Sequence, residues 1–370
     1  MITFLSLSPF PTTKAYGVTL KYTHDAVVDL GIKAQIISVN KLNCRNHRLR
    51  FLNWVMEQLR HTYREKWVLI GKIGFHLHRK LFYIYIMNEV EIKSDDVLWL
   101  RDIRLTRSIS QKIRAPIVLE VHQIPNQKEV EILSSLDANV IVCPISEEVL
   151  SYLRRVCPLL ELTSLPMGVP NFFFSHTNRL DEQHFSLGYF GSYRSSGHLQ
   201  GLEEMLKNLI ELFRADSGFR VFMSGIGEEG YKVLSELAKV LGIQQQLVLV
   251  KFLEHAKMPE NMMNCNVLVL PYPEGKYFAS RFPIKAMEYA SLKVPILCTS
   301  TTSHRNIFDE SEVWFYDYNL SDSLLTTFLK IQTSPTIASE KADLAYAKSL
   351  NFSYSSRIEK IMGHLQASNQ

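Results

Sequence analysis

Two charged residues one helical turn apart stand out in the stretch SRFPIKAMEYASLKVP, residues 280–295. Lys285 and Glu288 lie three positions apart, and their neighbours form the apolar face of a predicted helix. The stretch lies between NVLVLPYP and VPILCTS, which predict two buried strands. A carboxylate between core strands costs free energy unless it binds something. We therefore expect the Lys285–Glu288 edge to face a ligand cleft. The alternative is a surface ion pair worth about 0.2–0.5 kcal/mol.

Two glycine-bearing loops that follow predicted strands are candidates for binding phosphate. The first, in GYFGSYRSSGHLQGLEEML, offers Gly191 for a close backbone approach and Arg194 for a fixed positive charge. The second, in MSGIGEEG, places Gly225 and Gly227 around a turn that opens a helix. The free N–H groups at a helix N-terminus suit an anion. Each loop could also be a plain connection, because glycine is common in turns.

The loop after the first predicted strand, SPFPTTKAYGVTLK, carries three further candidates. Lys14 could contact a phosphate or an acceptor molecule, and Tyr16 and Gly17 follow it. The alternative is a proline-rich connection without a role in binding.

Two more candidates lie at the ends of predicted strands. Arg101 follows DVLWL, and His122 follows APIVLEV. Because open parallel sheets bind ligands at the carboxyl ends of their strands, we expect both side chains to face the cleft. Glu120 is expected to point to the opposite face. A histidine at an apolar strand end can also be purely structural.

Short apolar runs alternate with amphipathic stretches along the chain, which is typical of doubly wound parallel sheets. In the first half we predict strands in ITFLSL, KAQIISV, DVLWLR, APIVLEVH, ANVIVCPI and LELTSLP. The pattern breaks at SLPMGVPNFFFSHTNRLDEQH and then restarts. A chain of 370 residues exceeds what one core usually supports. We predict an α/β protein of two Rossmann-like domains facing a central cleft, over residues 1–165 and 166–350. A helix over 351–370 would pack back toward the first domain.

The positive charge is concentrated in one segment. The net charge of +4 is too small to indicate a nucleic-acid partner, but residues 41–80 hold ten Lys or Arg against two Glu. Basic and aromatic residues interleave there at helical spacing, as in helices that lie on a membrane surface. A helix packed on the first sheet with a solvated basic face is the alternative.

The cysteines and the lengths of the apolar runs indicate the cellular compartment in which we expect the protein. Five scattered cysteines without metal-binding spacing indicate free thiols in a reducing cytoplasm. The start has no basic leader, and no run reaches the roughly 18 apolar residues of a membrane-spanning helix. We expect a cytoplasmic protein, with segment 45–80 as a contact to the inner face of a membrane if it docks there.

The stretch PYPEGKYFASRFPIKAMEYASLKVPILCTS resembles the signature of the retaining glycosyltransferase family numbered four. Members often read S-P-x-K-x-x-E-Y-x-A-x-x-x-P-[IV] here and share the two-Rossmann GT-B fold. The resemblance extends to GYFGSYRSSGHLQGL, SGIGEEG, SLPMGVP and NFSYSSR. It implies an acceptor-side first domain and a second domain that binds a nucleotide sugar.

The resemblance also implies roles for the second-domain residues. Glu288 matches the second glutamate of the family's E-x7-E motif, which holds the ribose of the donor. The first glutamate would fall at Ser280, where this chain has a hydroxyl. The family's lysine of the K-G motif would fall near Gln200, so either Arg194 or Arg281 would bind the diphosphate.

Further donor contacts follow from the same comparison. The helix-entry loop from Ala279 to Ile284, which includes Phe282, would lie against the phosphates. The turn from Gly225 to Gly227 and the exit around Phe252 would line the nucleobase pocket.

In the first domain the stretches LRD and EVH are similar to family motifs. This favours a functional His122, which would orient either the acceptor or the donor sugar. Lys14, Tyr16 and Arg101 would lie on the acceptor side.

The chemistry expected is transfer of a sugar with retention, without a metal or other cofactor. No D-x-D metal motif occurs, so His122, Arg281 and Lys285 are the expected catalytic residues, and cations and helix ends would stabilise the departing diphosphate. The partners would be a nucleotide sugar and a glycan or lipid-linked acceptor of surface polysaccharide synthesis. Two alternatives keep the same fold: a nucleotide-sugar epimerase and a non-catalytic binding protein.

Overall fold

The computed structural model describes residues 1–8, 10–12, 15–39, 68–175, 185–195, 197–275, 278 and 282–367, with the backbone alone at 15 and 68–75. Three predicted site residues, Lys14, Ser280 and Arg281, lie outside the described residues. So does the basic segment up to residue 67. None of the described helices combines the length and the apolar character that crossing a membrane requires.

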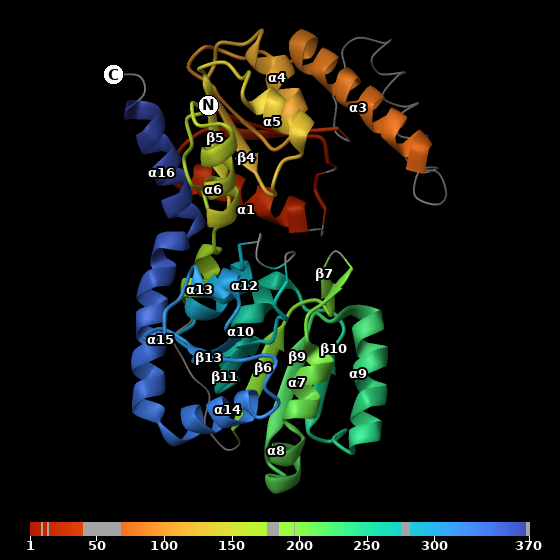
Figure 1. Cartoon of the computed structure of the whole chain (residues 1–370). Coiled ribbons are helices and arrows are strands. Elements are labelled where there is room, and N and C mark those ends of the chain that lie inside the picture. The colour runs from red at the N-terminus through yellow and green to blue at the C-terminus, as the bar shows by residue number, and fades with distance from the viewer. Residues whose placement is uncertain are drawn as a thin grey trace. The chain divides into compact units, whose positions relative to one another are not determined.

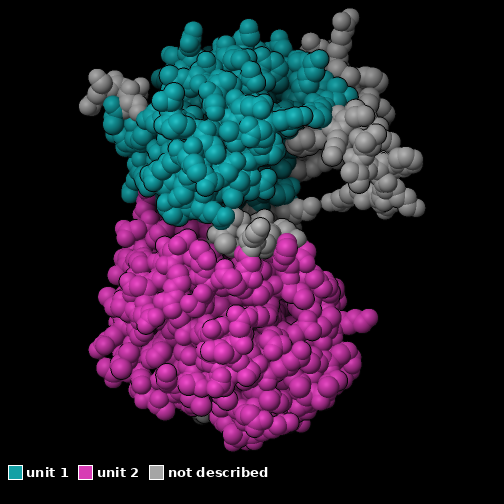
Figure 2. All heavy atoms as spheres, viewed as in Figure 1, with its two compact units in different colours: residues 1–167, 357–370 teal, residues 168–356 magenta. Residues whose placement is uncertain are grey.

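The chain divides into two compact units, coloured separately in Figure 2. Unit 1 comprises residues 1–167 and 357–370, and unit 2 comprises residues 168–356. Each unit has its own hydrophobic core around its own parallel sheet. The helix α16 (Tyr354–Ala367) contributes its residues from Arg357 onward to unit 1.

Unit 1 is built on a five-stranded sheet of order β2-β1-β3-β4-β5, in which every paired strand is parallel. The other elements of unit 1 are β1 (Ile2–Ser6), α1 (Ala15–Asp29), β2 (Ala34–Ser38), α3 (Val68–Glu89), β3 (Val97–Leu100), α4 (Ile103–Ser110), β4 (Ile117–Val121), α5 (Gln127–Leu133), β5 (Val140–Pro144) and α6 (Glu147–Val156). The strand order changes direction between β1 and β3. Ligands of doubly wound folds bind at such a switch point.

The predicted strands of unit 1 are present, with one exception. The strand expected in LELTSLP is wrong, because the segment makes only an isolated bridge between Leu162 and Val142 of β5. Every residue of the strands β3, β4 and β5 is buried, whereas in LELTSLP buried residues alternate with partly exposed ones.

Unit 2 is built on a six-stranded parallel sheet of order β10-β9-β6-β11-β12-β13. Its elements are β6 (Ser186–Phe190), β7 (Arg194–Ser195), β8 (His198–Leu199), α7 (Leu202–Asn208), α8 (Ile210–Ala215), β9 (Arg220–Ser224), α9 (Gly227–Leu241), β10 (Leu247–Val250), α10 (Met258–Met263), β11 (Val267–Leu270), α12 (Ile284–Ala290), β12 (Ile296–Thr299), α13 (Thr302–Arg305), β13 (Trp314–Tyr316), α14 (Ser323–Thr333) and α15 (Pro335–Ser349). Short 3₁₀ turns cover Asn171–Ser175, His255–Lys257 and Leu350–Phe352.

The sheet of unit 2 changes direction between β6 and β11, the first and fourth of its six strands in chain order. This is the strand order 3-2-1-4-5-6 of dinucleotide-binding Rossmann folds. Helix α9 lies beside the edge strand β10, and α14 lies beside the opposite edge strand β13 (Figure 1). The loops after β6 and β11 are therefore the ones to examine for a ligand.

Candidate functional site

Helix α12 brings Glu288 into the interior of unit 2. Pro283 precedes the helix, and Ala286, Met287 and Tyr289 pack its buried face into the core. Glu288 is 5% exposed, and its Oε1 lies 2.8 Å from Nε2 of His255. A buried carboxylate of this kind is stable because it has a partner. The interpretation of Lys285 and Glu288 as a surface pair is excluded by this burial of Glu288.

His255 is a site residue that the sequence analysis missed. It lies just beyond β10, and its ring contacts Phe172 and Phe173 at centroid distances of 5.7 and 5.3 Å. Burial opposes the charged form, but the hydrogen bond and the negative charge of Glu288 outweigh it and raise the pKa of His255. The only signal in the sequence was a histidine close to a strand exit.

Lys285 lies at the switch point of the unit 2 sheet. Its Nζ donates to Oη of Tyr189, the residue next to the end of β6, at 3.3 Å. The ammonium group also lies 5.3 Å from the ring of Tyr189 and 5.8 Å from the ring of Tyr272, which follows β11. Burial lowers the pKa of Lys285 to about 8, and the charge of Glu288 only partly opposes this.

Gly191 makes room for this lysine, and Gly225 lies beside Gly191. A Cβ added to Gly191 would lie 2.1 Å from Nζ of Lys285, so no other residue fits there with the lysine in this position. The N–H of Gly191 donates to the carbonyl of Ser224, and a Cβ added to Gly225 would lie 3.6 Å from the Gly191 backbone. Gly225 has a φ of +81°, which favours glycine. The structure thus brings together three of the predicted site residues, Gly191, Gly225 and Lys285.

The remaining donor-side candidates of unit 2 have other surroundings. Arg194 makes an exposed ion pair with Glu229, with Nε 2.7 Å from Oε1. Gly227, with a φ of +72°, opens α9, and Phe252 is 72% exposed beyond β10. None of these makes a hydrogen bond or an ion pair with Lys285 or Glu288 in the part of unit 2 that is described.

Phe282 and Ile284 shape the entry of α12. The ring of Phe282 stacks on Phe352 at 5.5 Å, and Ile284 is the first helical residue. These contacts fix the start of the helix that carries Lys285 and Glu288.

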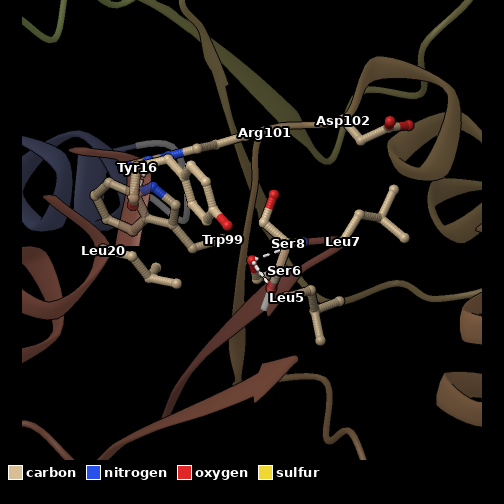
Figure 3. Close-up of a pocket in the computed structure, with 9 residues that line it drawn as sticks. All are labelled: Leu5, Ser6, Leu7, Ser8, Tyr16, Leu20, Trp99, Arg101 and Asp102. Carbon is tan, nitrogen blue, oxygen red and sulfur yellow. Dashed lines mark hydrogen bonds between the residues drawn. The ribbon is translucent and has the colours of Figure 1, made fainter. Parts of the chain in front are cut away.

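Unit 1 has a pocket of about 180 Å³ at its own switch point (Figure 3). The carboxyl ends of β1 and β3 form two sides of it, and α1 forms a third. It is lined by Leu5, Ser6, Leu7, Ser8, Tyr16, Leu20, Trp99, Arg101 and Asp102. The lining mixes hydroxyl groups and charges with apolar and aromatic carbon, as sugar sites do. Tyr16 and Arg101 therefore share one pocket, and Gly17 lies next to it, where a Cβ would lie 2.2 Å from Cγ2 of Thr12.

Arg101, which follows β3, is held by residues of two other elements, β4 and α1. Its Nε donates to Glu120 at 2.7 Å, and its Nη1 donates to the carbonyl of Tyr16 at 3.2 Å and to the hydroxyl of Thr19 at 3.0 Å. The guanidinium therefore joins β3, β4 and α1 and fixes the wall of the pocket.

The expectation for Glu120 is wrong. Glu120 does not point away from His122: its Oε2 lies 2.7 Å from Nε2 of His122. Residues two apart in an extended strand point to the same face, so the shared orientation follows from the strand itself. Its Oε1 accepts from Trp99 at 2.8 Å and from Arg357 at 2.6 Å.

The charges around Glu120 and His122 shift the pKa values of both groups. Burial would raise the pKa of Glu120, but Arg101, Arg357 and the His122 hydrogen bond hold it well below its usual value. Burial lowers the pKa of His122, with the two guanidinium groups adding to the effect and Glu120 opposing it. At neutral pH the pair is a carboxylate and a neutral imidazole.

Together these groups could hold an anion in unit 2 and hydroxyl groups in unit 1. Among the described residues, no three His, Cys, Asp or Glu side chains are grouped closely enough to bind a metal ion.

Part of the chain matches a family model, and the whole chain is similar to several solved structures. Residues 188–344 match the family model of glycosyl transferases group 1. The whole chain is similar to a glycosyltransferase from Rickettsia africae, at 14% identity and a TM-score of 0.70 over 98% of this chain and 97% of that one. It is also similar to sucrose-phosphate synthase from Thermosynechococcus elongatus, at 11% identity and a TM-score of 0.70 over 99% of both chains. A third similar structure is Anabaena Alr3699/HepE in complex with UDP and glucose, at 12% identity and a TM-score of 0.65 over 99% of both chains.

None of the curated proteins compared with the chain is a match. At these identities the solved structures establish the fold. It is the predicted one, two Rossmann-like domains of the GT-B type.

Proposed function

We propose that the chain, whose residues 188–344 match the family model of glycosyl transferases group 1, is a glycosyltransferase that moves a sugar with retention from a nucleoside diphosphate sugar to a glycan or lipid-linked acceptor. We propose further that it does so without a metal ion, in the synthesis of a surface polysaccharide or glycoconjugate.

One observation carries the donor proposal: Lys285 lies over a bare glycine at the switch point of the unit 2 sheet. A cation next to backbone without side chains suits a diphosphate, because the phosphates can approach the main chain and the ammonium together. The Anabaena protein was solved with UDP-glucose, so a UDP-sugar is the first donor to test.

Glu288 and His255 would form the ribose end of the same site. An ionised carboxylate can accept hydrogen bonds from two neighbouring hydroxyl groups. One of its oxygens already accepts from His255, which fixes the orientation of the carboxylate before a donor binds.

The reaction itself needs a stabilised leaving group. The bond between the anomeric carbon and the diphosphate oxygen breaks, and the bond to the acceptor oxygen forms on the same face. The acceptor proton passes to the departing phosphate. Lys285 and Arg281 would stabilise the negative charge on that phosphate as it develops.

The pocket at the β1/β3 switch point is the proposed site for the acceptor end. Its volume of about 180 Å³ limits it to a small group, such as one terminal sugar residue. Tyr16 and the two serine hydroxyls would contact the ring and its hydroxyl groups.

Calorimetry with UDP and a panel of nucleotide sugars tests the proposal. We expect wild type to bind a donor and Lys285→Ala to bind it at least tenfold more weakly. Lys239→Ala, which removes only a surface pair with Glu236, should bind like wild type. No binding of any nucleotide sugar at high protein concentration would overturn the proposal. Donor binding without hydrolysis or transfer would identify a non-catalytic binding protein instead.

A further inference from the structure

We propose that Glu120 is a positioning residue that fixes His122 as the tautomer protonated at Nε2, so that His122 meets a sugar through Nδ1, and that Arg357 holds Glu120 in place. The role of His122 toward a sugar rests on the proposed function, whereas the tautomer follows from the contact between Glu120 and His122 alone.

The carboxylate of Glu120 is fully used by four donors. Oε1 accepts from Nε1 of Trp99 and from Nη2 of Arg357, and Oε2 accepts from Nε of Arg101 and from Nε2 of His122. The four distances lie between 2.6 and 2.8 Å, and the side chain is 0% exposed. The donors come from β3, α16 and the end of β4, so the group cannot turn without breaking contacts to several elements.

The proton on His122 follows from this arrangement. An ionised carboxylate can only accept, so Nε2 must carry the hydrogen that it shares with Glu120. In the neutral ring the other nitrogen, Nδ1, then has a lone pair and no hydrogen. The His122 side chain is 33% exposed while that of Glu120 is buried, so the side of the ring away from Glu120 is the side a substrate can reach.

The lone pair on Nδ1 selects its partner. It accepts a hydrogen bond from a hydroxyl group and offers nothing to a carboxylate. The group that contacts His122 is therefore a sugar hydroxyl, and a uronic acid carboxylate in its place would bind less well.

Arg357 supports the arrangement from a distant part of the sequence. Its Nη2 donates to Glu120, and its Nε donates to the carbonyl of Pro166 at 2.8 Å. Its guanidinium lies 5.6 Å from the ring of Trp99, and the residue is 4% exposed. The positive charges of Arg357 and Arg101 together keep Glu120 ionised next to a neutral imidazole.

Nitrogen NMR of the full chain labelled with ¹⁵N-histidine tests the tautomer directly. The signals of His122 are identified by their loss in His122→Gln. We expect one protonated and one unprotonated nitrogen, with the proton on Nε2, from pH 6.5 to 8. A neutral ring protonated on Nδ1, or an imidazolium at pH 7.5, would overturn the proposal. This readout does not depend on activity, so a correct tautomer without sugar transfer would instead count against the proposed function.

A second experiment separates positioning from a structural role. Glu120→Gln should lower kcat/KM at least tenfold, move the acid limb of the pH profile to lower pH and give a mixture of His122 tautomers. Glu161→Gln, which breaks another Glu–His pair of the same unit at His364, should leave all three unchanged. Arg357→Gln should lower kcat/KM, and Arg357→Lys should recover most of it.

A Glu120→Gln protein with the wild-type tautomer and pH profile would contradict the positioning role. Should this variant fail to fold, the wild-type spectrum still decides the question.

Discussion

Gly191 illustrates how one missing side chain can define a binding corner. Its φ does not lie in the left-handed region, so glycine is required here for space and not for φ. The space is occupied by the ammonium group of Lys285. The glycine and the lysine are 94 positions apart in the chain. They lie close together because β6 and β11 are neighbours at the switch point of the sheet.

Gly191→Ala should impair donor binding more than folding. The new methyl group displaces Nζ of Lys285, which is the free end of a flexible side chain, so the unfolding free energy should change by less than about 1 kcal/mol. The Kd for a UDP-sugar should rise about tenfold or more. Calorimetry and thermal unfolding check the two halves of the prediction. Gly363→Ala, at an exposed helical position with open space around it, is the control and should leave donor binding unchanged. A larger loss of stability than of affinity would argue against this account.

The His255–Glu288 pair should make stability depend on pH. The pKa of His255 is raised in the folded protein, so its contribution is complete below about pH 6.5 and disappears as the pH rises through the folded pKa. His255→Gln should therefore cost most at pH 6, about 1–3 kcal/mol, and less at pH 9. Urea unfolding at several pH values measures the difference. The same cost at both pH values would contradict the prediction.

At the scale of elements, the strands and the helix carrying Lys285 were predictable because their apolar runs are uninterrupted. The candidates at strand ends followed from them: Gly191, Gly225 and Lys285 meet because parallel strands end at one edge of the sheet. The partners of the buried carboxylates were not predictable. His255 and Arg357 reach Glu288 and Glu120 through tertiary packing, and nothing in the local sequence encodes such a pairing.

Helix α3 also contains a tertiary contact that the local sequence does not predict. Arg79 was counted with the basic segment, but its Nη2 lies 3.0 Å from Oδ2 of Asp102, the residue that caps α4. At this position the helix packs on unit 1, which is the alternative interpretation of the segment. The proposed membrane contact then depends on the other basic residues.

Asp102 should contribute more to the unfolding free energy as the N-cap of α4 than as the ion-pair partner of Arg79. Its Oδ1 accepts from the N–H of Leu105 at 2.8 Å. Asp102→Ala loses both interactions and should lower the unfolding free energy by about 0.5–2 kcal/mol. Asp102→Asn should lose less than half of that, because the amide oxygen still accepts from Leu105 and only the charge paired with Arg79 is removed. Urea unfolding of the two variants decides; equal losses would assign the effect to Arg79.

At the scale of the whole molecule, each of the two units has its own core and its own strand order, and each has a candidate binding site at the switch point of its sheet. Both place their candidate residues at the point where the strand order reverses, between β6 and β11 in one unit and between β1 and β3 in the other. The proposed donor and acceptor sites therefore belong to two independent sheets.

A chain that stops at Ser356 should damage one unit selectively. It lacks Arg357 and three residues buried in unit 1: Ile358, Ile361 and Leu365. Hydrogen exchange should accelerate in β4 and β5 at least tenfold, while β6, β9 and β11 keep their protection. Exchange by mass spectrometry measures both units in one sample, so unit 2 is the internal control. Equal acceleration in both units would contradict the prediction.

The contact between Glu120 and Arg357 has a consequence for how the protein is made. The two residues are 237 positions apart, and a ribosome adds about 5–20 residues per second, so the arginine is synthesised roughly 12–47 s after the glutamate. During that interval the nascent first domain holds a buried carboxylate that lacks one of its two arginines. Translation of the whole second domain thus comes before the first domain can reach its finished state, and a product of premature termination would carry Glu120 and His122 without Arg357.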